Sequence, residues 1–313
     1  MKIIYIGSVE GYEASQEACR GRAEVEHIEA TAGAVSAALT DADGLIDASM
    51  KVPLTDAMIE AAPKLRIISC ATTGSDHIQR QQLDKRGIPV RTLREDPDLL
   101  KNITPAAELS WALLMALARK LTAAARHTSS GHWDREEFPG IMLNGRTLGI
   151  IGCGRIGQWM GRYAKAFGMR VIGTDPHIDP WPEHIEQVSL ETLTQTADFL
   201  TVHVHLSDET RHLIDRQLFE ALKPGAIFIN TSRSGVADEA ALLDALESGR
   251  LGGAGLDVLD GEPDTAGHPL VAYAESHDNL ILTPHCGGFS PDAVRLVCAQ
   301  AATKIIDHLE GPA

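Results

Sequence analysis

Short hydrophobic runs alternate with alanine-rich segments over the first hundred residues. The runs are rich in Ile, Val and Leu and are bounded by Gly, Pro or Asp, as β-strands usually are. They predict four strands, at Lys2–Ile6, Gly44–Ile46, Arg66–Ser69 and Ile88–Arg91. Segments such as 32–39 and 55–62 lie between them and are typical of helices. Strands and helices that alternate at this spacing predict a parallel sheet with right-handed crossovers.

The pattern changes at Thr104, where a long helical segment begins. Pro105 suits the first turn of a helix, and Thr104 is a candidate N-cap. The residues that follow, as far as residue 130, predict one helix of about six turns. Because this segment is apolar over more than a narrow stripe, we expect it to be buried on more than one side, between two domains or within a dimer.

A second alternation follows and predicts six further strands: Thr147–Gly152, Arg170–Asp175, Phe199–Val204, Ala226–Asn230, Gly253–Asp257 and Asn279–Leu282. This is the number of strands in a complete dinucleotide-binding sheet. Residues 291–309 predict a final helix, and no low-complexity linker separates the two halves. At roughly 150 residues per domain, a chain of 313 residues is expected to form two α/β domains, each with a doubly wound parallel sheet.

Composition and charge exclude several classes of function. The formal net charge of −15 disfavours nucleic acid and anionic membranes as partners. No apolar run approaches the roughly 18 residues of a membrane span, and the apolar stretch at the start is too short for a signal peptide. The five cysteines are odd in number and show no CxxC spacing. They predict a reduced, cytoplasmic protein with neither a disulfide framework nor a zinc site.

The segment 147–157, TLGIIGCGRIG, carries the most specific local motif. It follows an apolar strand and precedes a helical stretch, the context of a dinucleotide-binding loop. In this interpretation Gly152 allows a tight turn, Gly154 the approach of a pyrophosphate, and Gly157 close packing of helix on strand. A purely structural glycine turn is the alternative.

Asp175 ends the next predicted strand, 18 residues after the last glycine of the motif. A carboxylate there accepts hydrogen bonds from the ribose hydroxyls and repels a 2′-phosphate, so the sequence favours NAD over NADP. The alternative is an Asp that caps the turn before Pro176.

Three polar segments follow predicted strands of the second sheet and contain Arg233, Glu262 and His285. Ligands of doubly wound sheets bind beyond the carboxyl ends of the strands, so we expect these residues at one edge. Each has an ordinary alternative: a surface cation, a loop acid and a turn histidine. Together they supply a cation, a carboxylate and a titratable imidazole, the set needed to reduce a keto acid.

With these residues the chain resembles the D-isomer-specific 2-hydroxy acid dehydrogenases, a family that includes glyoxylate and hydroxypyruvate reductases and 3-phosphoglycerate dehydrogenases. The matching segments span nearly the whole chain: Thr73–Asp76, Asn102–Glu108, Gly152–Gly157, Asp175, Asn230–Arg233, Asp257, Glu262–Pro263 and Thr283–His285. The resemblance implies a flavodoxin-like substrate domain over residues 1–101 plus 289–313 and a Rossmann NAD-binding domain over 102–288. It also implies a homodimer, formed through the helix after Thr104 and the segment near Trp133.

The resemblance further implies an activity and residue roles. The activity is NAD-dependent hydride transfer between the nicotinamide and C2 of a small 2-oxo or 2-hydroxy carboxylate. Arg233 would hold the substrate, His285 would act as acid/base, and Glu262 would pair with His285. Backbone N–H groups of Thr73, Gly74 and Ser75 would bind the substrate carboxylate. The implied cofactor contacts are Gly152, Gly154, Arg155, Ile156, Gly157, Asp175, His203, Thr231, Ser232, Arg233, Asp257, His285, Gly287 and Gly288.

Some residues depart from the family pattern, and other interpretations stay open. Ser234, His205 and Ala106 stand where the family usually has Gly, Pro and Val or Thr, which affects contacts at the edge of the cofactor. His203 and His205 lie on one face of a strand, where a lining of the cofactor site is favoured over a metal pair because no third ligand is evident. The rival function is a non-enzymatic NAD-binding protein of the same fold. Lys51 is a candidate contact for a second anionic group of the substrate.

Overall fold

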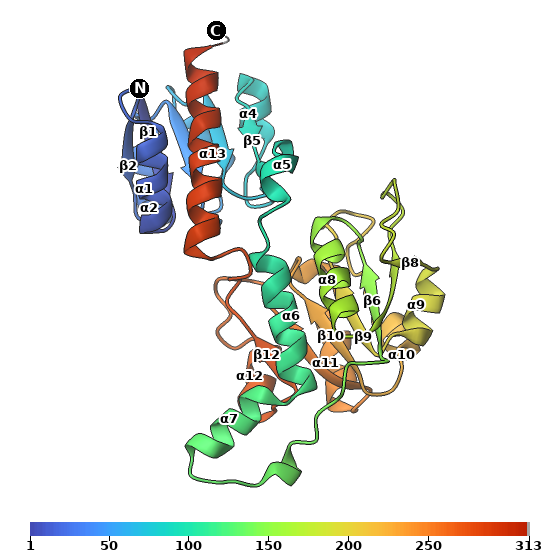
Figure 1. The fold of residues 1–313 in the computed structure, drawn as a ribbon. Coiled ribbons are helices and arrows are strands. Elements are labelled where there is room, and N and C mark those ends of the chain that lie inside the picture. The colour runs from blue at the N-terminus through green and yellow to red at the C-terminus, as the bar shows by residue number, and fades with distance from the viewer. Residues whose placement is uncertain (312–313) are drawn as a thin grey trace. The chain divides into compact units, whose positions relative to one another are not determined.

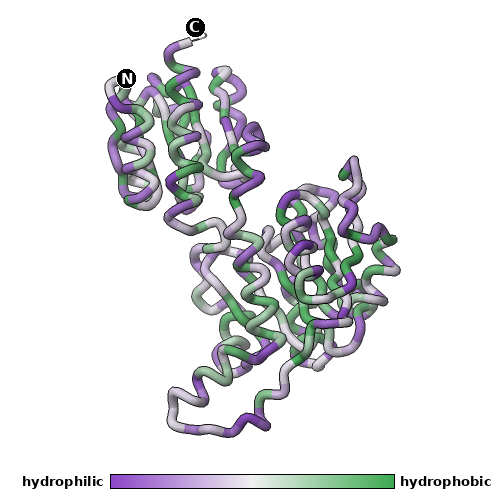
Figure 2. Tube along the Cα trace, viewed as in Figure 1, coloured by the Kyte–Doolittle hydropathy of each residue, from purple (hydrophilic) through white to green (hydrophobic). Residues whose placement is uncertain are grey.

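The structure is a computed structural model that describes residues 1–311, and the chain divides into two compact units (Figure 1). Unit 1 comprises Met1–Ile103 together with the chain from Phe289 onward, and unit 2 comprises Thr104–Gly288. Hydrophobic residues concentrate along the central strands of each unit and on the helix faces that cover them (Figure 2).

Unit 1 is a five-stranded parallel sheet in the order β2-β1-β3-β4-β5. Its strands are β1 (Lys2–Ile6), β2 (Glu24–His27), β3 (Gly44–Asp47), β4 (Ile67–Cys70) and β5 (Val90–Arg91). Its helices are α1 (Val9–Ala18), α2 (Ala32–Leu39), α3 (Asp56–Glu60), α4 (Gln81–Arg86), α5 (Pro97–Leu100) and α13 (Pro291–Glu310), with a 3-10 turn at Leu93–Glu95. One core packs under α1 and α13 and the other under α2 and α3, so the sheet is buried on both faces.

Unit 2 is a seven-stranded parallel sheet in the order β12-β11-β10-β9-β6-β7-β8. Its strands are β6 (Thr147–Ile151), β7 (Arg170–Thr174), β8 (Glu186–Gln187), β9 (Phe199–Val202), β10 (Ala226–Asn230), β11 (Leu251–Leu256) and β12 (Leu280–Leu282). Its helices are α6 (Pro105–Ala118), α7 (Leu121–Ser129), α8 (Arg155–Ala166), α9 (Leu190–Thr196), α10 (Arg216–Ala221), α11 (Glu239–Glu247) and α12 (Pro269–Ser276), with 3-10 turns at Arg135–Glu137 and Ser234–Val236. The predicted class, two doubly wound parallel α/β sheets, is confirmed.

The two strands that the sequence did not predict, β2 and β8, lie at sheet edges. Strand β2 has the sequence Glu-Val-Glu-His, and of its residues Val25 alone is buried. Strand β8 is two exposed residues, Glu186 and Gln187. An edge strand needs little apolar surface, and charged residues discourage pairing with other chains, so neither segment carries the hydrophobic run typical of a central strand.

The single long helix predicted after Thr104 is wrong, because it divides into α6 and α7. The break lies at Lys120, whose φ of 49° is in the left-handed region. Ala118 O would accept the next helical hydrogen bond but instead accepts Ile141 N at 2.7 Å. The chain returning toward β6 therefore ends the helix, and nothing local in the sequence indicates that contact.

Candidate active site

The glycine loop joins β6 to α8 in a conformation that two of its glycines require. Gly152 has φ +89°, and a Cβ on it would lie 2.7 Å from the carbonyl carbon of His203. A Cβ on Gly157 would lie 2.2 Å from Gly152 O, which is backbone and cannot move aside. A Cβ on Gly154, by contrast, meets nothing within 4 Å. The loop is thus closed toward the protein and open at Gly154, as a pyrophosphate cradle requires.

The N-terminus of α8 carries no side-chain cap. Its N-cap, Gly154, makes no side-chain capping bond, and its first turn carries no acidic residue. The N-caps of α9, α10 and α11, in contrast, are Ser189, Asp215 and Asp238, whose side chains accept backbone N–H groups. Arg155, in the first turn, is partly buried, and this burial lowers the pKa of its guanidinium. The backbone N–H groups of the first turn, the helix dipole and a desolvated cation all favour an anion at this point.

Asp175 follows β7 and is fixed beside the glycine loop. Its Oδ2 accepts Cys153 N at 2.9 Å, and its Oδ1 accepts His177 N at 2.9 Å. The carboxylate therefore both caps a turn and stands next to the cradle, so the two interpretations of this residue are compatible. A negative charge held here fits ribose hydroxyls and opposes a 2′-phosphate.

His203 follows β9 and is largely withdrawn from water. Burial lowers its pKa to about 3. Its Nε2 lies 2.8 Å from Thr201 Oγ1, and its buried Nδ1 has no hydrogen-bond partner. Among residues 1–311 no group of three His, Cys, Asp or Glu side chains is arranged to hold a metal ion.

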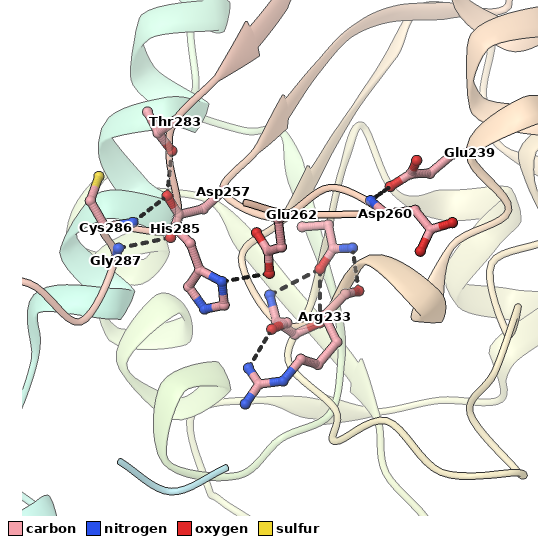
Figure 3. Close-up of polar contacts among 11 residues, drawn as sticks. Arg233, Glu239, Asp257, Asp260, Glu262, Thr283, His285, Cys286 and Gly287 are labelled. Carbon is pink, nitrogen blue, oxygen red and sulfur yellow. Dashed lines mark hydrogen bonds and ion pairs between the residues drawn. The ribbon is translucent and has the colours of Figure 1, made fainter. Parts of the chain in front are cut away.

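The turn after β12 carries His285 and is organised by one buried carboxylate, Asp257, which is 1% exposed. Asp257 Oδ1 accepts Thr283 Oγ1 at 2.6 Å and Cys286 N at 2.9 Å, and Oδ2 accepts Gly287 N at 2.7 Å (Figure 3). His285 itself has φ 51°, in the left-handed region that residues other than glycine adopt only uncommonly. The three bonds to Asp257 hold the turn in that conformation.

His285 forms a hydrogen-bonded pair with Glu262. Its Nδ1 lies 2.7 Å from Glu262 Oε1, and both side chains are about one third exposed. The contact with the carboxylate orients the ring and leaves Nε2 on the side away from Glu262 (Figure 3).

Arg233 lies in the segment that follows β10, and Asn230 shapes that segment. Asn230 is 2% exposed; its Oδ1 accepts Ser232 N at 3.0 Å and its Nδ2 donates to Arg233 O at 2.9 Å. Arg233 Nη1 donates to Ser232 O at 2.8 Å. Thr231 Oγ1 lies 2.6 Å from Ser110 Oγ on α6. The sequence did not predict a role for Asn230 or Ser110. The one signal for Asn230 is a polar residue at the end of an otherwise apolar strand.

Unit 1 contains the predicted substrate loop. Thr73 O accepts Arg94 Nε at 2.9 Å, and Ser75 Oγ accepts Arg80 Nη2 at 2.8 Å. Asp47, which the sequence did not single out, is fully buried. Its Oδ1 accepts Ser49 N at 2.9 Å, and its Oδ2 lies 2.5 Å from His77 Nε2, so it connects the segments after β3 and β4.

A family model agrees with this site. The model "D-isomer specific 2-hydroxyacid dehydrogenase, NAD binding domain" matches residues 111–287, more than half of the chain. The chain belongs to this family. Hydroxypyruvate reductase of Thermotoga maritima is 37% identical over 256 residues, 82% of this chain and 81% of that protein.

Two further comparisons extend the match. D-3-phosphoglycerate dehydrogenase of Rattus norvegicus is 36% identical over 278 residues, 88% of this chain and 50% of that protein, so the chain spans about half the length of these relatives. The crystal structure of TT0316 protein from Thermus thermophilus has a TM-score of 0.87 at 33% identity, covering 99% of this chain and 97% of that one. The resemblance drawn from the sequence is therefore confirmed at the level of the family and fold. No helix within residues 1–311 is long and apolar enough to cross a membrane.

Proposed function

We propose that this protein is an NAD-dependent D-2-hydroxy acid dehydrogenase that also reduces the corresponding 2-oxo acids. The proposal rests on the 2.7 Å contact between His285 Nδ1 and Glu262 Oε1. The same unit contains the glycine loop and the N-terminus of α8, which has no side-chain cap. A partly exposed histidine that a carboxylate orients can act as an acid/base, and the glycine loop offers a site for a dinucleotide.

We propose that residues of unit 2 bind the cofactor, from the glycine loop at one end to the turn of His285 at the other. The backbone of Gly152, Gly154, Ile156 and Gly157, with Arg155, would take the phosphates. Asp175 would take the ribose. The residues assigned to the nicotinamide end are His203, Thr231, Ser232, Arg233, Asp257, His285, Gly287 and Gly288. When bound, the reduced cofactor supplies a hydride to C2 of the 2-oxo acid.

His285 would balance that hydride with a proton. In reduction, protonated His285 donates from Nε2 to the substrate's carbonyl oxygen, which becomes the hydroxyl, and the imidazole is left neutral. In oxidation, neutral His285 removes the hydroxyl proton. Glu262 stabilises the imidazolium in both directions.

Arg233 would orient the substrate by pairing its guanidinium with the carboxylate and polarising the carbonyl. The resemblance adds Thr73, Gly74 and Ser75 as substrate-carboxylate contacts and Lys51 as a contact for a second anionic group. The strong negative charge of the chain makes such local cations necessary for an anionic substrate.

We further propose a homodimer in a reducing, cytoplasmic compartment. Leu121, Trp133 and Met142, on α7 and the segment before β6, are 59%, 86% and 74% exposed, which is unusual for large apolar side chains. All five cysteines are free, which fits a reducing compartment. Light scattering should give the mass of two chains, and the dimer proposal fails if the protein is monomeric at micromolar concentration.

A screen of 2-oxo acids with NADH and with NADPH tests the proposed activity. Wild type should oxidise NADH with at least one 2-oxo acid and form the D-hydroxy product, measured by chiral chromatography. His285→Gln should lose that activity while still binding NADH, because only the proton donor is removed. Tight NADH binding by wild type without turnover of any 2-oxo acid would contradict the proposal and favour a non-enzymatic NAD-binding protein.

A further inference from the structure

A further histidine–carboxylate pair, Glu239 and His268, contacts the segment that carries Glu262. Glu239 is the first residue of α11, and His268 is the N-cap of α12. His268 Nε2 lies 2.9 Å from Glu239 Oε2, and the two side chains are only 15% and 16% exposed. Glu239 Oε1 also accepts Asp260 N at 3.0 Å (Figure 3). One carboxylate therefore contacts both ends of the segment 260–268.

That segment has few other constraints within itself. It runs, mostly exposed, between two buried residues, Leu259 and Leu270. Its internal backbone bonds are short in range: Asp264 N donates to Gly261 O at 3.1 Å and His268 N to Thr265 O at 3.1 Å. Such bonds shape local turns, but they do not fix the position of the segment relative to the rest of the unit. The contacts of Glu239 supply that anchorage.

We propose that Glu239 and His268 are positioning residues for the His285–Glu262 pair. They hold the 260–268 segment so that the Glu262 carboxylate meets His285 Nδ1. This inference rests on the proposed function for its meaning in catalysis, but the geometry that it invokes is independent of any substrate. Neither residue is a catalytic residue, since neither touches the imidazole.

The hydrogen bonds of Glu239 and His268 define where the proton of this pair lies. His268 Nδ1 accepts Leu270 N at 3.2 Å, so this nitrogen carries no proton. Nε2 therefore carries it and donates to Glu239, which accepts as a carboxylate. Burial raises the pKa of Glu239, and the nearby Asp260 carboxylate acts in the same direction, whereas the bonds from Asp260 N and His268 oppose that rise. Both nitrogens and both oxygens are thus used.

Because both oxygens of Glu239 accept hydrogen bonds, Glu239→Gln tests these bonds with a side chain of nearly the same size. The amide oxygen can still accept Asp260 N, but the amide nitrogen then faces His268 as a donor. His268 must either oppose it with its own Nε2–H or move the proton to Nδ1, where it opposes Leu270 N–H. Either way one hydrogen bond is lost, and the far end of the segment is released.

The test is the titration of His285 by NMR in the protein without cofactor or substrate, assigned by comparison with His285→Gln. Glu262→Gln should lower the titration midpoint, since the carboxylate that contacts His285 Nδ1 is lost. Glu239→Gln should lower it too, but by less, since the Glu262 carboxylate is displaced and not removed. The double variant should have the midpoint of Glu262→Gln alone, because a positioning residue has no effect once its target is gone.

Two further variants keep the test interpretable. Glu247→Gln, at the exposed end of the same helix, makes the same charge change and should leave the midpoint unchanged. His268→Asn keeps an acceptor for Leu270 N, loses the bond to Glu239 and should match Glu239→Gln, which also covers the case in which one variant fails to fold. If Glu239→Gln and His268→Asn retain the wild-type midpoint while Glu262→Gln shifts it, the positioning role is overturned. If Glu262→Gln itself has no effect, the proposed acid/base pair fails, and the positioning role fails with it.

Discussion

Replacing Asp257 by Asn tests whether one buried carboxylate holds His285 in place. Asp257 accepts three hydrogen bonds, from Thr283 Oγ1, Cys286 N and Gly287 N, and is 1% exposed. An Asn side chain offers one oxygen and one donor group. If its oxygen serves Thr283 and Cys286, its amide nitrogen faces Gly287 N–H, which then has no acceptor. The reverse orientation leaves Cys286 N without one.

The cost follows from the better of these two orientations. One backbone hydrogen bond to a charged acceptor is lost, which is worth about 1.5–3 kcal/mol of the free energy of unfolding. For a unit of this size that corresponds to a fall in Tm of roughly 3–12 °C. The turn also loses a restraint on the left-handed backbone of His285. A displacement of about 1 Å at a reacting group costs on the order of 100-fold in rate.

The assay combines thermal unfolding with steady-state reduction of the best 2-oxo acid. Asp257→Asn should lower both Tm and kcat/KM, while Thr283→Val, which removes only the side-chain bond, should have a smaller effect on kcat/KM. A variant that is destabilised as expected but reduces its substrate at the wild-type rate would refute the claim that these bonds position His285. An unchanged Tm would show that the three hydrogen bonds to Asp257 do not stabilise the fold.

Three other predictions concern the cofactor, the substrate and the pH dependence of stability. Asp175→Ser should narrow the preference for NADH over NADPH, compared by kcat/KM, because it removes the carboxylate that repels a 2′-phosphate. Arg233→Ala should lower kcat/KM by at least about 100-fold with NADH affinity nearly unchanged, and Arg233→Lys should also be poor because an ammonium lacks the planar fork. The pKa of His203 is lowered to about 3 by burial, so the unfolded chain binds a proton that the folded one does not, and stability falls as pH drops below about 6.5. His203→Asn should therefore make that fall shallower, by up to about 1.4 kcal/mol per pH unit, in denaturation without cofactor.

Each of these has an outcome that contradicts it. If wild type has equal kcat/KM with NADH and NADPH, Asp175 does not discriminate against the 2′-phosphate. Near-wild-type kcat/KM in Arg233→Ala removes the substrate-anchoring role of that residue. Parallel stability curves for wild type and His203→Asn between pH 6 and pH 4 show that His203 does not resist protonation in the folded protein.

Local patterns in the sequence were sufficient for the parts of the fold with strong periodicity. The helix predicted at 32–39 and the strands predicted at 2–6 and 226–230 have the predicted bounds. The break between α6 and α7 could not be predicted, because Ile141 N ends the helix from more than twenty residues away. The exposed edge strands β2 and β8 lack the apolar runs on which strand prediction depends.

The candidate site divides in the same way. Gly152 and Gly157 are identifiable from sequence because the backbone geometry excludes a side chain at both positions. Asp175 is found by its spacing from the glycine motif, and its contact with the ribose stays a prediction. Glu239 and His268 are separated by 29 positions (268 − 239), and neither belongs to a motif, so only the folded chain reveals their contact with each other. Hydrogen bonds between loops have no periodicity from which they can be predicted.

The most direct test of the account is a pair of pH–rate profiles, one for each direction, for wild type and Glu262→Gln, with substrate binding measured alongside. In the proposed mechanism reduction requires protonated His285, oxidation requires the neutral ring, and the Glu262 carboxylate would stabilise the imidazolium. In Glu262→Gln, the rate of reduction should therefore begin to fall at a lower pH than in wild type, and oxidation should stay active to lower pH. If both profiles keep their inflections where wild type has them, Glu262 is not the partner of the acid/base, and the proposed mechanism is contradicted at its centre.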